Sequence, residues 1–153
     1  MLKKIISGGQ TGVDQAALDT ARRLGISHGG WVPKGRMTEA GPLPLTYQMQ
    51  EMPSEDYAAR TEKNVVDSDG TLIISRGRPT GGTDYTRKMA LKHGKQLLHI
   101  DLSMGQKPSE AGSLIGSWIE MSRIETLNVA GPRASSDPAI YNDASNILAH
   151  AFK

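Results

Sequence analysis

The stretch Ser7-Gly8-Gly9-Gln10-Thr11-Gly12 decides the fold, because it joins an expected strand over residues 3–6 to an expected helix over residues 13–24. Glycines at such a junction let the backbone turn tightly and approach a ligand closely, since they carry no Cβ. The helix that follows directs its unpaired N–H groups and the positive end of its dipole toward the loop. The stretch indicates either an anion-binding loop or a turn that binds nothing, and by itself it favours neither.

The helix after this loop has a buried face and recognisable ends. Apolar residues recur at helical spacing from Val13 to Leu24, and Gly25 follows as the expected C-terminal signal. Thr11 is the expected N-cap, and Asp14, three residues later, completes an approximate capping box. Capping is a sufficient structural explanation for the carboxylate of Asp14.

Strands and helices alternate along the rest of the chain, which predicts an α/β fold with a mainly parallel sheet. The clearest strand is the apolar run over residues 71–75. Ser54 is the expected cap of one helix, and Asp137 followed by Pro138 predicts the start of the last one. Further strands are expected over residues 29–32, 48–52, 95–101 and 127–130, and helices over residues 53–67, 84–93, 108–122 and 138–151.

The composition predicts a single domain over residues 1–153, with 37% hydrophobic and 22% charged residues. A net charge of +2 gives no electrostatic footprint for nucleic acid. The absence of cysteine excludes disulfides, thiolate metal sites and a cysteine nucleophile, and the scattered histidines predict no metal site. With no signal peptide or long apolar run, we expect a cytoplasmic protein that binds no membrane.

One expected helix carries a polar stripe that has two interpretations. Arg60, Asn64 and Asp67 share a face of the helix over residues 53–67, at positions i, i+4 and i+7. We favour a solvated polar surface. The alternative is that Arg60 and Asn64 reach a ligand.

Two later loops resemble the first in composition. Residues 75–83 combine glycines, hydroxyls and the cations Arg76 and Arg78, and residues 131–136 carry Arg133. Because the carboxyl ends of parallel strands meet at one edge of a sheet, we expect all three loops to converge there. Backbone N–H groups, hydroxyls and arginines together favour an anionic ligand that carries phosphate over a set of merely solvated arginines.

The familiar nucleotide motifs do not match. No Lys-Ser or Lys-Thr follows Gly12, so the first loop is not a P-loop. Ser7 stands where a dinucleotide fingerprint has its first glycine. Lys34 and Arg36 lie after the second strand, where that fingerprint has an acid, and these two cations could reach the same crevice. An NAD dehydrogenase is therefore disfavoured.

Residues 7–19, Ser-Gly-Gly-Gln-Thr-Gly-Val-Asp-Gln-Ala-Ala-Leu-Asp, resemble the opening of the molybdenum cofactor carrier protein family. Residues 29–36, 60–65 and 81–83 also stand in that family's order, so the resemblance covers essentially the whole chain. It implies a Rossmann-like three-layer sandwich of the SLOG superfamily, related to LOG-type (lysine decarboxylase-like) phosphoribohydrolases. It further implies a homo-oligomer, dimer or tetramer, that holds the molybdenum cofactor (molybdopterin) without transforming it, with a molybdoenzyme as acceptor.

One departure from the related phosphoribohydrolases bears on catalysis. Their Gly-Gly-x-Gly-Thr-x-x-Glu motif ends in a catalytic glutamate, and Thr86 stands at that position here. A hydroxyl cannot replace a carboxylate as general base, so we expect no catalytic residue. The alternatives are a phosphoribohydrolase-like enzyme that works through Asp14 or Asp84, and a nucleotide-binding sensor.

The expected ligand is thus molybdopterin, or otherwise a nucleotide or phosphate. Trp118, Ile119 and Met121 could face a second copy of the chain or belong to the core. The residues expected to bind the ligand are Gly8, Gly9, Gln10, Thr11, Gly12, Lys34, Arg36, Arg76, Gly81, Gly82, Thr83 and Arg133.

Overall fold

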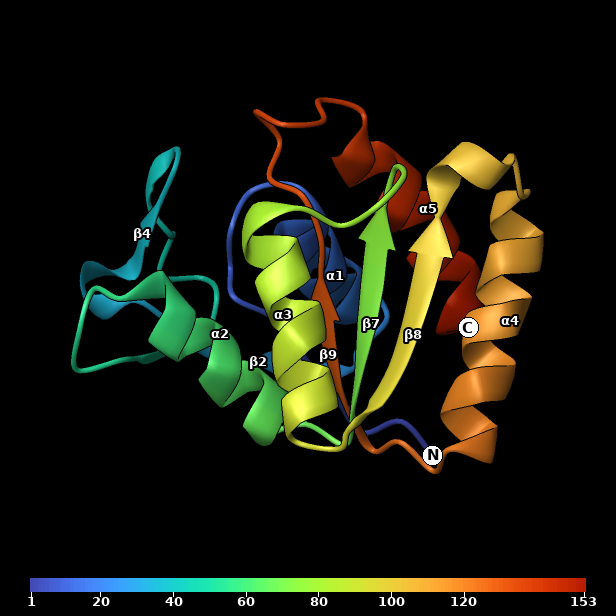
Figure 1. The fold of residues 1–153 in the computed structure, drawn as a ribbon, viewed down its shortest axis with the longest axis horizontal. Helices are drawn as coiled ribbons and strands as arrows, with labels where there is room; N and C mark the ends of the chain where they lie inside the picture. Colours follow the sequence, from blue (N-terminus) through green and yellow to red (C-terminus); the bar gives the residue numbers. More distant parts are fainter.

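A five-stranded parallel sheet forms the middle of the structure, a computed structural model that describes residues 1–153. Its strands run in the order β2-β1-β9-β7-β8, and Figure 1 shows β9, β7 and β8 side by side. Every neighbouring pair is parallel, which confirms the predicted α/β fold with a mainly parallel sheet. The strands span Lys4–Ile6 (β1), Ser27–Gly29 (β2), Gly70–Ser75 (β7), Gln96–Asp101 (β8) and Thr126–Ala130 (β9).

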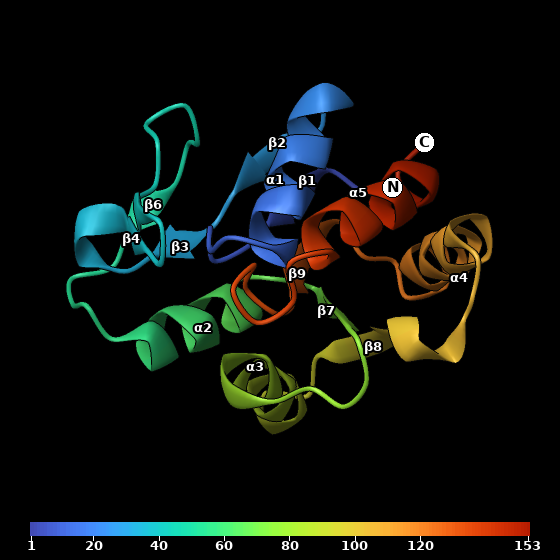
Figure 2. The same ribbon diagram turned by 90° about the horizontal axis from the view of Figure 1, so that it is seen from above.

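Helices cover both faces of this sheet and complete a three-layer sandwich. In the view from above, α1, α4 and α5 lie on one side of the sheet and α2 and α3 on the other (Figure 2). None of these helices combines the length and the apolar character that crossing a membrane requires. They span Val13–Arg23 (α1), Tyr57–Val66 (α2), Gly81–Lys92 (α3), Pro108–Met121 (α4) and Ile140–Ala151 (α5).

The main core lies between the sheet and the layer formed by α1, α4 and α5. Strand β7 is buried along its whole length because helices cover both of its faces, which accounts for its apolar sequence. In α4, Ile119 is buried and Trp118 packs against the core, whereas Met121 is 85% exposed. Two of the three residues that could have faced a partner therefore belong to the protein's own packing.

The segment between β2 and α2 projects from one side of the sandwich (Figures 1 and 2). It contains a parallel pair, Trp31–Val32 (β3) with Gln50–Glu51 (β6), and a small hairpin, Met37–Thr38 (β4) with Gly41–Pro42 (β5). A short 3-10 turn at Lys34–Arg36 lies between β3 and β4.

The single strand predicted over residues 29–32 is in fact two strands, separated at Gly30. Gly30 has φ +122, and a Cβ there would lie 2.3 Å from the carbonyl oxygen of Ser7. The chain therefore passes so close to the first loop that only glycine fits. Strand β2 stays in the main sheet, and β3 pairs with β6 outside it.

The predicted cap of α1 is wrong. Gly12, not Thr11, is the N-cap residue, and no side chain caps this helix. The hydroxyl of Thr11 instead donates to the carboxylate of Glu39, at the tip of the β4–β5 hairpin. A contact from a distant segment thus competes successfully with the local capping pattern.

Other helix starts also shift by a few residues. Helix α2 begins after Asp56, whose side chain accepts the N–H of Ala58 at 2.9 Å, so Ser54 is not its cap. Helix α5 begins at Ile140 rather than at residue 138, and the carboxylate of Asp137 does not cap it but pairs with Arg76 from another loop. Helix α3 begins at residue 81, three residues earlier than predicted.

Candidate functional site

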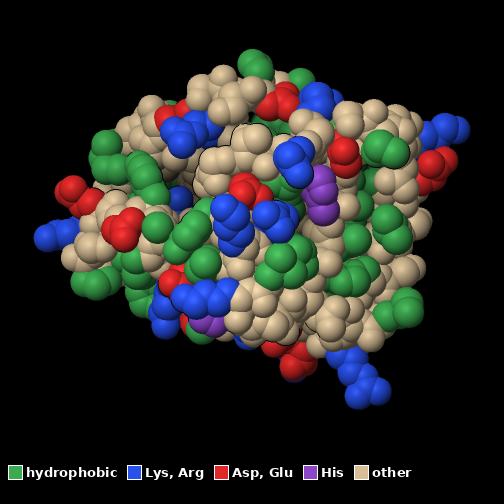
Figure 3. Space-filling model, in the orientation of Figure 1, with side chains coloured by type: hydrophobic (Ala, Val, Ile, Leu, Met, Phe, Trp, Pro, Cys, Tyr) green, Lys and Arg blue, Asp and Glu red, His purple; other side chains and the backbone are tan.

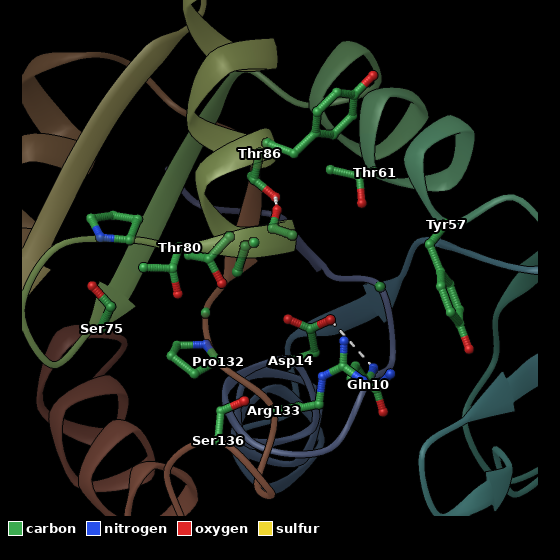
Figure 4. Close-up of a pocket in the computed structure, with 18 of the residues that line it drawn as sticks. Gln10, Asp14, Tyr57, Thr61, Ser75, Thr80, Thr86, Pro132, Arg133 and Ser136 are labelled. Carbon is green, nitrogen blue, oxygen red and sulfur yellow. Dashed lines mark hydrogen bonds between the residues drawn. The ribbon is translucent and has the colours of Figure 1, made fainter.

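A cavity of about 460 Å³ lies at the carboxyl edge of the sheet, between the ends of β7 and β9, the first loop and the helices α2 and α3. The three loops 7–12, 75–83 and 131–136 meet there, as the parallel-strand argument predicts. Figure 4 shows polar side chains from all three loops around this space. The predicted binding residues that line it are Gly8, Gln10, Arg76, Gly81, Gly82, Thr83 and Arg133.

Gly9 and Gly12 shape the first loop without lining the cavity. Their φ angles are 74° and 83°, in the region that favours glycine. A Cβ at Gly12 would lie 2.3 Å from the carbonyl oxygen of Pro132, and a Cβ at Gly9 would lie 2.9 Å from Leu43. Both glycines allow the loop to pack tightly against its neighbours.

Thr11, Lys34 and Arg36 also lie outside the cavity lining. The Thr11 hydroxyl is engaged by Glu39 and accepts the backbone N–H of Ala134 at 3.1 Å. Arg36 donates three hydrogen bonds to carbonyl oxygens of its own projecting segment. Lys34 is exposed on the same segment and forms no ion pair. The structure therefore does not bring these residues to the three-loop cavity.

The interpretation of the α2 stripe as a solvated surface is wrong for two of its three residues. Arg60 is 8% exposed and Asn64 is 3% exposed. Asn64 both accepts from and donates to the backbone of Trp31, so it fixes β3 against α2. Arg60 lines the cavity and donates from Nη1 to the carbonyl oxygen of Gly8. Only Asp67 remains on the surface.

Asp14 lines the cavity instead of completing a capping box. Asp14 is 8% exposed, and its Oδ2 accepts the backbone N–H of Gln10 at 3.3 Å. Burial raises the pKa of Asp14 to about 6, although the nearby Arg60 and the backbone N–H groups of Gln10 and Gly8 oppose this rise. Burial likewise lowers the pKa of Arg60. The cavity thus holds a carboxyl group that can change protonation near neutral pH.

The first turn of α3 opens directly into the cavity. Thr80 is the N-cap residue, and its side chain makes no capping hydrogen bond. A Cβ built at Gly81 or Gly82 meets no atom within 4 Å, so the space in front of these residues is free. Their N–H groups have no partner within the helix, and the buried Thr83 lines the same space. This turn offers hydrogen-bond donors to an anion.

The three loop arginines differ in their pairing. Arg76 donates to Asp137 at 3.0 Å and to Asp143 at 2.7 Å, and these two carboxylates raise its pKa. Arg78 and Arg133 line the cavity and form no ion pair. Among the loop arginines, these two have a charge that remains available to a ligand.

Helix α3 presents no free carboxylate to the cavity, as the positions of Thr86 and Asp84 show. Thr86 lines the cavity, and its hydroxyl donates to the carbonyl oxygen of Gly82 at 3.0 Å. Asp84 lies outside the cavity lining and pairs with Arg87 and Lys88, among the basic side chains that gather over α3 in Figure 3. The position that faces the ligand space therefore carries a hydroxyl, and the neighbouring carboxylate is neutralised on the helix surface.

Several lining residues were not assigned to the site from the sequence. They are ordinary polar residues, and only Thr61 lies in a stretch that carries the family resemblance. Ser75 and Ser136 are marked only by their position in the loops that follow strand ends. The others come from α2, α3 and β9, where nothing local separates a cavity residue from a surface or core residue. These additional lining residues are Tyr57, Thr61, Ser75, Tyr85, Asn128 and Ser136.

Comparisons with known proteins agree with the resemblance carried by residues 7–19. The chain matches the family model described as "Circularly permutated YpsA SLOG family" over residues 5–152. It is similar to a crystal structure named "Putative molybdenum carrier protein" from Syntrophus aciditrophicus SB, with 53% sequence identity and a TM-score of 0.97. This match covers 99% of the present chain and 96% of the other, and it confirms the Rossmann-like fold. No curated protein matches.

Proposed function

The chain belongs to the circularly permutated YpsA SLOG family, and from this premise we propose that it binds a phosphorylated anionic ligand in the three-loop cavity. The observation that carries this proposal is the free first turn of α3 beside two unpaired arginines. The name of the similar Syntrophus protein supports molybdopterin as the ligand. We therefore propose a carrier or binding protein for the molybdenum cofactor.

The phosphate end of the ligand is assigned to α3. Gly81 and Gly82 line the cavity as the first residues of α3, where the helix dipole favours negative charge, and Thr83 lies in the same turn. Arg78 and Arg133 add guanidinium groups, which bind phosphate with directed hydrogen bonds. The donor set therefore fits a phosphate monoester.

The rest of the cavity suits the ring system of such a ligand. Tyr57 from α2 and Tyr85 from α3 line it, and so do Gln10 from the first loop and Asp14 from α1. Because the chain has no cysteine, no protein thiolate contacts the metal, and the cofactor would be held through its phosphate and its ring. The dithiolene of the cofactor supplies the metal binding when it is present.

Non-catalytic binding is the function that the carboxylates favour. Thr86 replaces the glutamate of the related phosphoribohydrolases, and Asp84 is occupied by Arg87 and Lys88. Asp14 remains the one carboxylate of the catalytic alternative that lines the cavity, and we assign it a role in binding, together with the buried Arg60. We further propose a cytoplasmic homo-oligomer that delivers the cofactor to a molybdoenzyme.

The test starts from protein purified from its own host and analysed by native mass spectrometry. Thermal-shift titrations then compare molybdopterin with nucleoside monophosphates and inorganic phosphate, since a ligand at a hundred times its Kd stabilises by about 2.7 kcal/mol. We expect a co-purified pterin, or stabilisation by molybdopterin above all other compounds. Stabilisation by a nucleotide alone, followed by release of its base, would show an enzyme instead.

A further inference from the structure

Two buried side chains of opposite charge lie next to each other against Gly8. Asp14 and Arg60 are each 8% exposed, and both line the cavity. A Cβ at Gly8 would lie 2.6 Å from Nη1 of Arg60 and 3.0 Å from Oδ2 of Asp14. Gly8 therefore leaves room for both groups at the same point of the cavity wall, although they form no direct ion pair.

Most of the hydrogen-bonding capacity of this pair is unused. Asp14 accepts the N–H of Gln10 at 3.3 Å, and the N–H of Gly8 also acts on its carboxyl, although a carboxylate has about four acceptor positions. Arg60 donates from Nη1 to the carbonyl oxygen of Gly8, although a guanidinium has about five N–H donors. The one buried side-chain atom that lacks a hydrogen-bond partner is Oγ of Ser145, so the free polar atoms of Asp14 and Arg60 remain accessible and can bind a ligand.

The second oxygen of Asp14 faces the interior of the cavity. In Figure 4 the carboxylate has one oxygen directed to Gln10 along the dashed line and the other turned toward Pro132 and Thr80. A ligand that satisfies this site must offer N–H donors to the carboxylate and an acceptor to the guanidinium, side by side.

We infer that Asp14 and Arg60 recognise the 2-amino-4-oxo-pyrimidine edge of a fused ring, as found in pterin and guanine. This edge presents a ring N–H and an amino group to Asp14, and its carbonyl oxygen to Arg60. The inference rests on the proposed function, since it assigns the ring end of the ligand whose phosphate lies at α3. A ribose diol would engage the carboxylate alone, and adenine offers no carbonyl to the guanidinium.

The test is isothermal titration calorimetry with GMP, IMP and AMP, which share ribose and phosphate and differ at this edge. We expect GMP to bind more tightly than IMP by roughly 10- to 100-fold, because the missing amino group leaves a buried charged acceptor unpaired. In Asp14→Asn this preference should fall to within about threefold. Asp69→Asn, whose carboxylate lies outside the cavity lining, is the matched control and should keep the preference. Far-UV circular dichroism verifies that each variant is folded.

Free pterin and its 2-oxo analogue lumazine separate this inference from the phosphate assignment. Equal binding of GMP, IMP and AMP, or a uniform loss for all three in Asp14→Asn, would overturn ring recognition and leave the phosphate site intact. Preference for pterin over lumazine without any binding of the monophosphates would support ring recognition and overturn the phosphate site. Failure of every compound to bind would overturn both.

Discussion

Nε of Arg76 donates to Oδ2 of Asp137 at 3.0 Å, and this contact ties the loop after β7 to the segment before α5. Asp143 neutralises the same guanidinium from the first turn of α5. Arg133, in contrast, lines the cavity without an ion pair. Arginines that look equivalent in the sequence therefore have different roles, one in holding two loops together and the other in meeting a ligand.

The first prediction concerns these two arginines. Arg133→Gln should weaken binding of a phosphorylated ligand by about tenfold, because a charge-assisted hydrogen bond is lost at a partly solvated site. Arg76→Gln should change the affinity less, since its charge is already neutralised. Calorimetric titration measures both, and Lys107→Gln, far from the cavity lining, is the control. A larger effect at Arg76 would contradict this division of roles.

The second prediction concerns the two cations of the projecting segment. Lys34→Gln should leave ligand affinity within about twofold, because Lys34 does not line the cavity. Arg36→Ala should destabilise the fold by roughly 1–3 kcal/mol, since it leaves three carbonyl oxygens without their donor. Urea denaturation and calorimetry measure the two quantities. Strong loss of binding in Lys34→Gln would extend the site onto this segment.

The third prediction concerns pH. The folded-state pKa of Asp14 is about 6, above the ordinary value of 3.8, so the folded protein holds this proton more tightly than the unfolded chain. The resulting stabilisation is fully present below the ordinary value and is lost as pH rises through about 6. Asp14→Asn lacks this titration. Its free energy of unfolding should rise relative to the wild type by up to about 3 kcal/mol between about pH 4 and pH 7.

Urea denaturation of both proteins across this range measures the difference, in which the other titrating groups largely cancel. A difference that does not vary with pH would show that Asp14 keeps an ordinary pKa in the folded protein.

The fourth prediction contrasts two glycines. Gly12→Ala should destabilise the protein by roughly 1–3 kcal/mol or more, because φ is +83 and the new Cβ would meet a backbone oxygen at 2.3 Å. Gly82→Ala should change stability by less than about 1 kcal/mol, because its Cβ meets nothing within 4 Å. Gly82→Leu should keep the fold and block the ligand. Thermal melts and titrations verify this, and unchanged binding in Gly82→Leu would remove α3 from the proposed site.

Much of the fold could be predicted because its signals are local. The apolar run over residues 71–75 is long enough to indicate a buried strand, and the glycine-rich loops mark where strands pass into helices. Parallel strands then require the loops to meet at one edge, which is where the cavity lies.

The errors arise where a distant segment overrides a local pattern. Thr11 does not cap α1, because the non-helical backbone of Gly12, with φ +83, makes Gly12 the N-cap, and the Thr11 hydroxyl binds the distant Glu39. Gly30 breaks a strand because the carbonyl oxygen of Ser7 lies beside it. Arg60 is buried because Gly8, far away in the sequence, lacks a Cβ. None of these relationships is visible in a short window of sequence.

The position of β9 in the sheet has a consequence for how the protein is made. Strand β9 is the last strand of the sheet in the sequence and therefore the last to be synthesised. Because it lies between β1 and β7, it joins the two halves of the sheet. A nascent chain that ends before residue 126 has two separate strand pairs, each with an unpaired edge, and lacks the loop over residues 131–136. The three loops of the cavity can therefore come together only after β9 and the loop that follows it have been synthesised.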